Sequence, residues 1–468
     1  MDRPRFAVVG RPNKGKSSIV ATLARDDAVH IDIRAGSTKQ SKNFPMSVDG
    51  QTLYELVDTP GLQRARAVLD WLESHCEDAA ARPATVRRFV VEHADDLRFQ
   101  DECQALQPIV EGAGIIYVVD GSVPYGAEYE AEMEILRWSG RPSLAVINPI
   151  ESDEFVEEWT AGLGQYFKTV RVFDAHRAEM TKQLELLELF GHLDPHWRPA
   201  LERAVATLRE DRQLQAESAS SHIADFIRAA LRYRVEKAVP DGAPLEPVQL
   251  LLLERYKADL SRREKQCRQR VEELYYYGDL SKVEAGFDLV EEDLFSLDKW
   301  YLWGLSKRAL NMVAASAGAV LGGGSGMAVD AASGGFLGGL GTLVAGAGGA
   351  ISGLWGVRKY ADQIAQVKIQ GMPTGGSLLA YGPAQNPNFP FVLLGRALRH
   401  HRLVCIRTHA DRSVLTLDEE LLDELSDAEK KRLGKLFEDL RRGKKSDQRQ
   451  KALHSMILGW CRAHAGLQ

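Results

Sequence analysis

The chain has 468 residues and a mass of 51.9 kDa, enough for roughly two to four domains. With 44% hydrophobic and 26% charged residues it is typical of a globular protein, which excludes wholesale disorder or a collagen-like repeat. A net charge of −6 argues against a protein that coats nucleic acid, and five scattered cysteines without a C-x-x-C exclude a disulfide framework or a zinc ribbon.

Short apolar runs alternate with helical stretches over the first 180 residues. Buried strands are predicted at 6–9, 115–119, 144–147 and 170–173, a helix at 17–24, and a hairpin of two strands around Asp49-Gly50. This order predicts an α/β domain over 1–180, with a mostly parallel sheet and helices on both faces. A polar stretch with helical spacing at about 62–110 is longer than an ordinary connection and predicts a helical insertion.

A phosphate-binding motif lies between the first predicted strand and the first predicted helix. The run Gly10-Arg11-Pro12-Asn13-Lys14-Gly15-Lys16-Ser17 fits the pattern G-x-x-x-x-G-K-S. In this context the backbone N–H groups close around phosphates, Lys16 reaches the β and γ oxygens, and Ser17 offers its hydroxyl to Mg²⁺. We predict that nucleotide binding here involves Gly10, Asn13, Lys14, Gly15, Lys16, Ser17 and Ser18.

A second motif, Asp58-Thr59-Pro60-Gly61, closes the strand that ends at Val57. Its carboxylate can hold Mg²⁺ through water, and the Gly61 N–H can sense the γ-phosphate. Between the two motifs a loop must supply the hydroxyl that completes the Mg²⁺ shell, and we predict Thr38, although Ser37 is adjacent. The predicted metal ligands are Ser17, Thr38 and Asp58, and the predicted catalytic set is Lys16, Thr38, Asp58 and Gly61.

Together the two motifs resemble those of the TrmE/Era/EngA class of P-loop GTPases, over roughly residues 5–176. The resemblance implies GTP and GDP as ligands, and guanine recognition at the place where that class carries N-K-x-D. This chain has Asn148-Pro149-Ile150-Glu151 there, so the resemblance implies that Asn148 and Glu151 recognise the guanine base. Glu151 has a longer side chain than the aspartate of the motif, and Pro149 stands in place of the lysine whose stem covers the base. It also implies that the backbone N–H of Ala175 contacts guanine O6.

Two further positions bear on hydrolysis under the same resemblance. Leu62 stands where the Ras type has its water-orienting glutamine, which implies slow GTP hydrolysis. Asn13 occupies the position that helps to coordinate K⁺ in potassium-activated relatives, where the cation can replace an arginine finger. Alternatively, Asn13 only shapes the turn.

The rest of the chain is mainly helical. A helical hairpin or stalk is predicted at 181–308, and a small C-terminal α+β module with a basic helical tail at 358–468. Between them, Asp330 is the only charged residue from 309 to 357 and divides this glycine-rich segment into apolar halves of 21 and 27 residues. Because about 20 residues cross a bilayer, the segment is either a membrane hairpin or a soluble hairpin buried in the protein.

This domain order resembles a bacterial family that joins an Era-like GTPase to a C-terminal domain of unknown function. We therefore expect a cytoplasmic switch that binds and slowly hydrolyses GTP with Mg²⁺, stimulated by K⁺ and associated with the inner membrane through 309–357. A homodimer or a protein partner would use the helical region. The alternatives are a nucleotide-locked structural module and a ribosome-associated GTPase. We do not expect nucleic acid as a partner, because only the basic tail would suit it.

Overall fold

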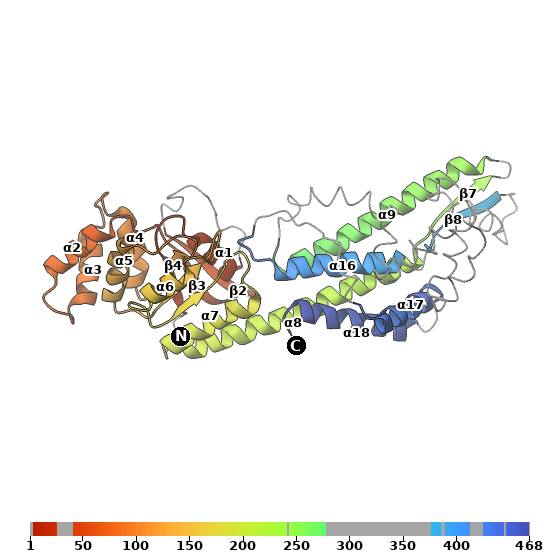
Figure 1. The fold of residues 1–468 in the computed structure, drawn as a ribbon. Coiled ribbons are helices and arrows are strands. Elements are labelled where there is room, and N and C mark those ends of the chain that lie inside the picture. The colour runs from red at the N-terminus through yellow and green to blue at the C-terminus, as the bar shows by residue number, and fades with distance from the viewer. Residues whose placement is uncertain are drawn as a thin grey trace, which may run out of the picture.

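The computed structural model describes residues 3–25, 41–240, 243–277, 376–384, 389–411, 425–443 and 446–467. They form an elongated molecule, with an α/β domain at one end and long helices extending away from it (Figure 1). Thr38 and the glycine-rich segment 309–357 lie outside the described residues, so the predictions about them stay predictions.

A six-stranded sheet with the order β2-β3-β1-β4-β5-β6 forms the centre of the α/β domain. Its strands are β1 Arg5–Val9, β2 Lys42–Val48, β3 Gln51–Asp58, β4 Gly114–Asp120, β5 Ser143–Asn148 and β6 Val170–Val172. Only β2 is antiparallel within this sheet; it pairs with β3 through a tight turn in which Asp49 and Gly50 have φ of 49° and 76°. The predicted α/β fold with a mostly parallel sheet is confirmed.

Helices cover both faces of this sheet. On one face lie α1 Lys16–Ala24, α7 Met180–Leu193 and the first turns of α8 Arg198–Arg232. On the other lie α2 Ala65–His75, α3 Arg82–Glu92, α4 Gln100–Val110, α5 Glu130–Trp138 and α6 Val156–Leu163. The core of the first face therefore continues beyond residue 180, into helices that the sequence-based division assigned to the stalk.

The range of the predicted insertion holds α2, α3 and α4. Their apolar side chains share one core with β1 and β4, and the rings of Trp71 and Phe89 pack edge to face with centroids 5.3 Å apart. This face of the sheet is thus built partly from the insertion.

Two long helices form the stalk (Figure 1). The helix α8 has 35 residues, and α9 Leu245–Leu274 has 30 and packs against it. Between them lies β7 Val235–Pro240, which pairs antiparallel with β8 Gly376–Tyr381. The sequence predicted a helical hairpin over this range, and the strand pair was missed.

Three further helices pack onto the stalk: α16 Phe389–Ile406, α17 Asp427–Arg441 and α18 Ser446–His464. Both apolar runs of this region, 391–394 and 403–406, belong to the single helix α16. Buried side chains of α8, α9, α16, α17 and α18 form one hydrophobic core. The stalk and the C-terminal part, expected as separate units, therefore share that core. Among the helices that the structure describes, none is both long and apolar enough to span a membrane.

Buried polar groups lie between α9, α16 and α18. Arg396 donates to Glu264 at 2.7 Å, and His400 contacts Glu272 at 2.8 Å. The Nδ1 atoms of His401 and His464 are 3.1 Å apart. Burial lowers the pKa of His401 well below its ordinary value and that of His464 to about 4, so both rings are neutral in the folded protein at pH 7.

We expect this histidine pair to make the helical part sensitive to acid. Unfolded histidine has a pKa near 6.5, so below that pH the unfolded chain binds protons that the folded chain does not. Between pH 7 and pH 5 the free energy of unfolding should fall by about 2 kcal/mol on account of His464 alone. Urea denaturation followed by helical circular dichroism measures this, and His464→Gln should weaken the pH dependence. An unchanged dependence in the variant would contradict the assignment.

Candidate nucleotide-binding site

The loop between β1 and α1 closes tightly because glycines stand where other residues would collide. A Cβ on Gly10 would lie 2.3 Å from the carbonyl oxygen of Val118, and one on Gly15 would lie 2.1 Å from Nδ2 of Asn148. Both glycines have positive φ, 145° and 82°, and Asn13 has a left-handed φ of 60°. The loop thereby curls over the N-terminus of α1, as a phosphate cradle requires.

Lys16, Ser17 and Asp58 meet beside this loop. The Lys16 ammonium is 7% exposed and donates to the carbonyl oxygen of Arg11 at 2.9 Å. Burial lowers its pKa to about 8, which still leaves it mostly protonated at neutral pH. The Ser17 hydroxyl donates to Asp58 at 2.8 Å. A hydroxyl and a carboxylate side by side are the hard oxygen ligands that Mg²⁺ prefers, so these two residues fit the ion.

Asp58 begins a turn that touches the phosphate loop. The hydroxyl of Thr59 donates to the carbonyl oxygen of Val8 at 2.7 Å. A Cβ on Gly61 would lie 2.6 Å from the backbone nitrogen of Pro12, so only glycine allows this approach. Leu62 is 1% exposed and packs in the core with the inserted helices. Its side chain therefore points into the protein and offers nothing to orient an attacking water.

The helix α4 of the insertion contacts two other segments, the one that follows Gly61 and the one that begins at Ser41. Buried Glu102 of α4 accepts hydrogen bonds from the backbone N–H groups of Gln63 and Arg64, at 2.9 and 2.6 Å. Gln104, two residues later, accepts from the N–H of Ser41 at 3.0 Å through its side chain. Sequence reasoning missed both residues, because an acid and an amide in a polar helix give no signal of such contacts.

Asn148, at the end of β5, links the phosphate loop to the loop of Ala175. Its Nδ2 donates to the carbonyl oxygen of Lys14 at 3.4 Å, and its Oδ1 accepts from the N–H of Ala175 at 3.1 Å. The carbonyl oxygen of Ala175 in turn accepts from Thr22 of α1 at 2.7 Å. Asn148 is 1% exposed, whereas Glu151 is exposed to solvent. The structure thus brings Asn148 and Ala175 together and leaves Glu151 on the surface beyond them.

A buried acid, also missed from sequence, anchors the phosphate loop from α5. Glu132 accepts a 2.6 Å hydrogen bond from Nε of Arg11, and its other oxygen accepts from the hydroxyl of Tyr117 at 3.1 Å. The guanidinium of Arg11 also lies 4.3 Å from the ring centroid of Tyr129. Burial raises the pKa of Glu132 to about 7. Because the Arg11 carbonyl accepts from Lys16, Glu132 helps to position the catalytic lysine candidate.

Two family models match the chain. Residues 5–148 match the family described as 50S ribosome-binding GTPase. Residues 161–457, more than half of the chain, match the family described as domain of unknown function (DUF3482).

Several curated proteins are similar to part of the chain. GTPase Der of Agathobacter rectalis is 34% identical over 122 residues, which cover 25% of this chain and 27% of that protein. GTPase Der of Prochlorococcus marinus is 26% identical over 212 residues, 44% of this chain and 40% of that protein. The chain thus spans about a quarter of the length of the first relative. A solved structure of Aquifex aeolicus Era bound to GDP·AlF4⁻ is 16% identical with a TM-score of 0.29, covering 58% of this chain and 89% of Era.

Proposed function

The chain belongs to the DUF3482 family and carries an Era-like P-loop GTPase domain, and we propose that it is a guanine-nucleotide switch that hydrolyses GTP slowly. The observation that carries the proposal is the cluster of Lys16, Ser17 and Asp58 beside a glycine-lined loop. A buried ammonium, a hydroxyl and a carboxylate at a helix N-terminus suit a nucleotide phosphate with its magnesium ion.

Each residue has a proposed role. Lys16 binds the β- and γ-phosphate oxygens, Ser17 and Asp58 hold Mg²⁺ with Thr38, and the Gly61 N–H responds to the γ-phosphate. Asn148 orients the loop of Ala175, and guanine O6 would accept from the Ala175 N–H, the group that donates to Asn148 in this structure. Glu151, although exposed, pairs with the N1–H and N2–H₂ donors of guanine. Mg²⁺ would neutralise charge that develops on the phosphates.

Guanine selectivity is the first test. In isothermal titration we expect GTP and GDP to bind with Mg²⁺, and ATP to bind at least about tenfold more weakly, because a carboxylate rejects the adenine edge. Lys16→Ala should abolish binding, while Lys42→Ala, on an exposed edge strand, should leave it unchanged. Equal affinity for ATP would refute the roles of Asn148 and Glu151, and no binding of any nucleotide would refute the switch.

Slow turnover and a response to potassium form the second test. The buried Leu62 supplies no polar group to orient the attacking water. We propose that K⁺ held by Asn13 supplies the positive charge that an arginine finger would place at the phosphates. Multiple-turnover phosphate release should be several-fold faster in KCl than in NaCl. Asn13→Gly tolerates the left-handed φ of 60° but lacks the amide oxygen, so it should lose this difference. No turnover in either salt would favour the nucleotide-locked module.

We also propose that the segment 309–357 attaches the protein to the inner face of a bacterial membrane. Support comes from its two apolar halves, the four-residue spacing of Gly318, Gly322 and Gly326, and aromatic and cationic residues at both ends, including Trp303 and Arg358. The helical part would then bind a protein partner or a second copy.

Cell fractionation tests this attachment. The full-length protein should sediment with membranes and require detergent for release, whereas a variant lacking 309–357 should remain folded and stay in the supernatant. The contrary result is a full-length protein found in the supernatant without detergent, together with a deletion variant that has lost its helical circular dichroism. That pair of results would show a buried hairpin.

A further inference from the structure

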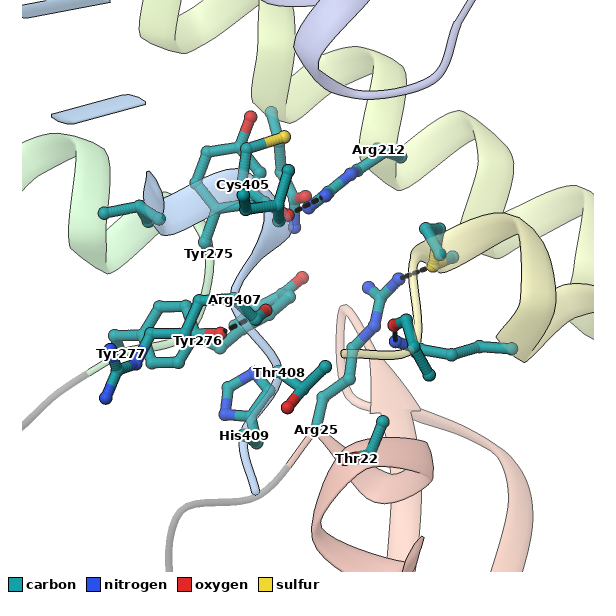
Figure 2. A pocket seen from close by; sticks show the side chains of 16 residues that line it. Thr22, Arg25, Arg212, Tyr275, Tyr276, Tyr277, Cys405, Arg407, Thr408 and His409 are labelled. Atoms are coloured by element: carbon teal, nitrogen blue, oxygen red, sulfur yellow. Dashed lines mark hydrogen bonds between the residues drawn. The ribbon is translucent and has the colours of Figure 1, made fainter. Parts of the chain in front are cut away.

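A cavity lies where the GTPase domain meets the helical part, away from the phosphate loop (Figure 2). Its empty volume is about 400 Å³ and is partly open to solvent. The end of α1, α7, the middle of α8, the residues after α9 and the end of α16 contribute its walls. On α8 the cavity falls between the stretch that packs on the sheet and the stretch that packs in the helical core. Polar residues therefore separate the two cores at this point.

Three arginines line this cavity, and among the described residues two aspartates form ion pairs with them. Arg25 pairs with Asp211 at 3.1 Å, and Arg407 pairs with Asp411 at 3.5 Å. Arg212 donates to the carbonyl oxygen of Cys405 and lies over the ring of Tyr275 at 4.8 Å. Within the described part of the chain it forms no ion pair with a carboxylate.

Arg212 is buried with hydrogen-bonding capacity left over. The residue is 9% exposed, and among the described residues its Nε finds no acceptor. The carboxylate of Asp211 does not accept from this Nε. It accepts instead from Arg25, from Tyr276 at 3.0 Å and from Gln215 at 2.9 Å. Burial and the neighbouring Arg212 lower the pKa of Arg25, which shows that the two cations interact. Asp211 interacts electrostatically with both Arg25 and Arg212, so this one carboxylate faces two buried guanidinium groups, and a water at Nε adds no negative charge.

We propose that this cavity binds a small soluble oxyanion of the phosphate class, held chiefly by Arg212 with Arg25 beside it. Planar guanidinium groups bind phosphate oxygens through paired N–H donors, and Arg is favoured for this where burial is high. The bound anion would contact side chains of both the GTPase domain and the helical part. Arg25 is also the last described residue before the segment that contains Thr38. The site does not depend on the proposed GTP hydrolysis.

Isothermal titration of the full-length protein with inorganic phosphate tests the site. A saturating non-hydrolysable GTP analogue with Mg²⁺ fills the β- and γ-phosphate positions and keeps inorganic phosphate out of the nucleotide site. The same titration of Lys16→Ala gives a second reading without nucleotide. We expect one phosphate per chain under both conditions. Binding in Lys16→Ala separates this proposal from that of GTP binding, because the cavity should survive loss of the nucleotide site.

Charge variants decide whether Arg212 carries the binding. Arg212→Gln should weaken phosphate binding at least about tenfold. Arg209→Gln, on an exposed part of the same helix, should leave the affinity unchanged. Asp211→Asn removes the carboxylate beside the arginines and should tighten binding, a gain that partial unfolding cannot produce. No phosphate binding in the protein loaded with the GTP analogue, or equal affinity in Arg212→Gln and Asp211→Asn, would overturn the proposal.

A lipid phosphate is tested separately by flotation with phosphatidylglycerol vesicles. For a soluble ion we expect flotation to be the same in the native protein and in Arg212→Gln. Flotation that requires Arg212, without binding of inorganic phosphate, would show that the source is a lipid headgroup and would overturn the assignment to a soluble ion.

Discussion

The close approach of Gly15 to Asn148 is the contact on which the nucleotide site depends. No side chain fits between them, so the phosphate loop lies directly on the end of β5. From there Asn148 reaches both the carbonyl oxygen of Lys14 and the N–H of Ala175. The buried amide of Asn148 thus fixes the distance between the phosphate loop and the loop of Ala175, the candidate guanine-binding loop. Buried amides with this many partners are costly to replace, because any substitution leaves polar backbone groups unpaired.

Support for the site comes from outside the sequence motifs. Glu132 on α5 holds Arg11 from one side, and Glu102 on α4 holds the backbone that follows Gly61 from the other. Both acids are buried, so each constrains its partner more strongly than a surface ion pair would. Because Glu102 belongs to the insertion, a movement of the segment after Gly61 must displace α4 or break two hydrogen bonds. Under the proposed function, a shift of this segment at the γ-phosphate would therefore either move the insertion or break both hydrogen bonds.

Sequence predicted those features that are encoded locally. The phosphate loop, the Asp49-Gly50 turn and three of the four predicted buried strands follow from residue types within a few positions of one another. The fourth, β6, is a strand but is largely exposed rather than buried. The pairing of β7 with β8 joins residues more than 130 positions apart and has no local signature. Runs such as 391–394 do not distinguish a strand from a buried helix, and α16 is buried on nearly all sides. For the candidate site, the resemblance pointed to Asn148 and Ala175, which the structure brings into contact, while their role in guanine binding stays a prediction. Glu102 and Glu132 are ordinary acids in the sequence, and only the fold brings them to the loop.

The helix α8 begins in one hydrophobic core and ends in another. Leu201 and Val205 pack against the sheet, while Ile223 and Phe226 pack among the stalk helices, along one uninterrupted rod of about 50 Å. Long helices curve gently and kink sharply only at particular features such as an internal proline, so a tilt at one end of α8 would be carried along its length. A small tilt of its first turns against the sheet would become a displacement of several ångströms at its far end. The length of α8 therefore determines how far a given tilt at the GTPase domain would displace the strand pair β7–β8.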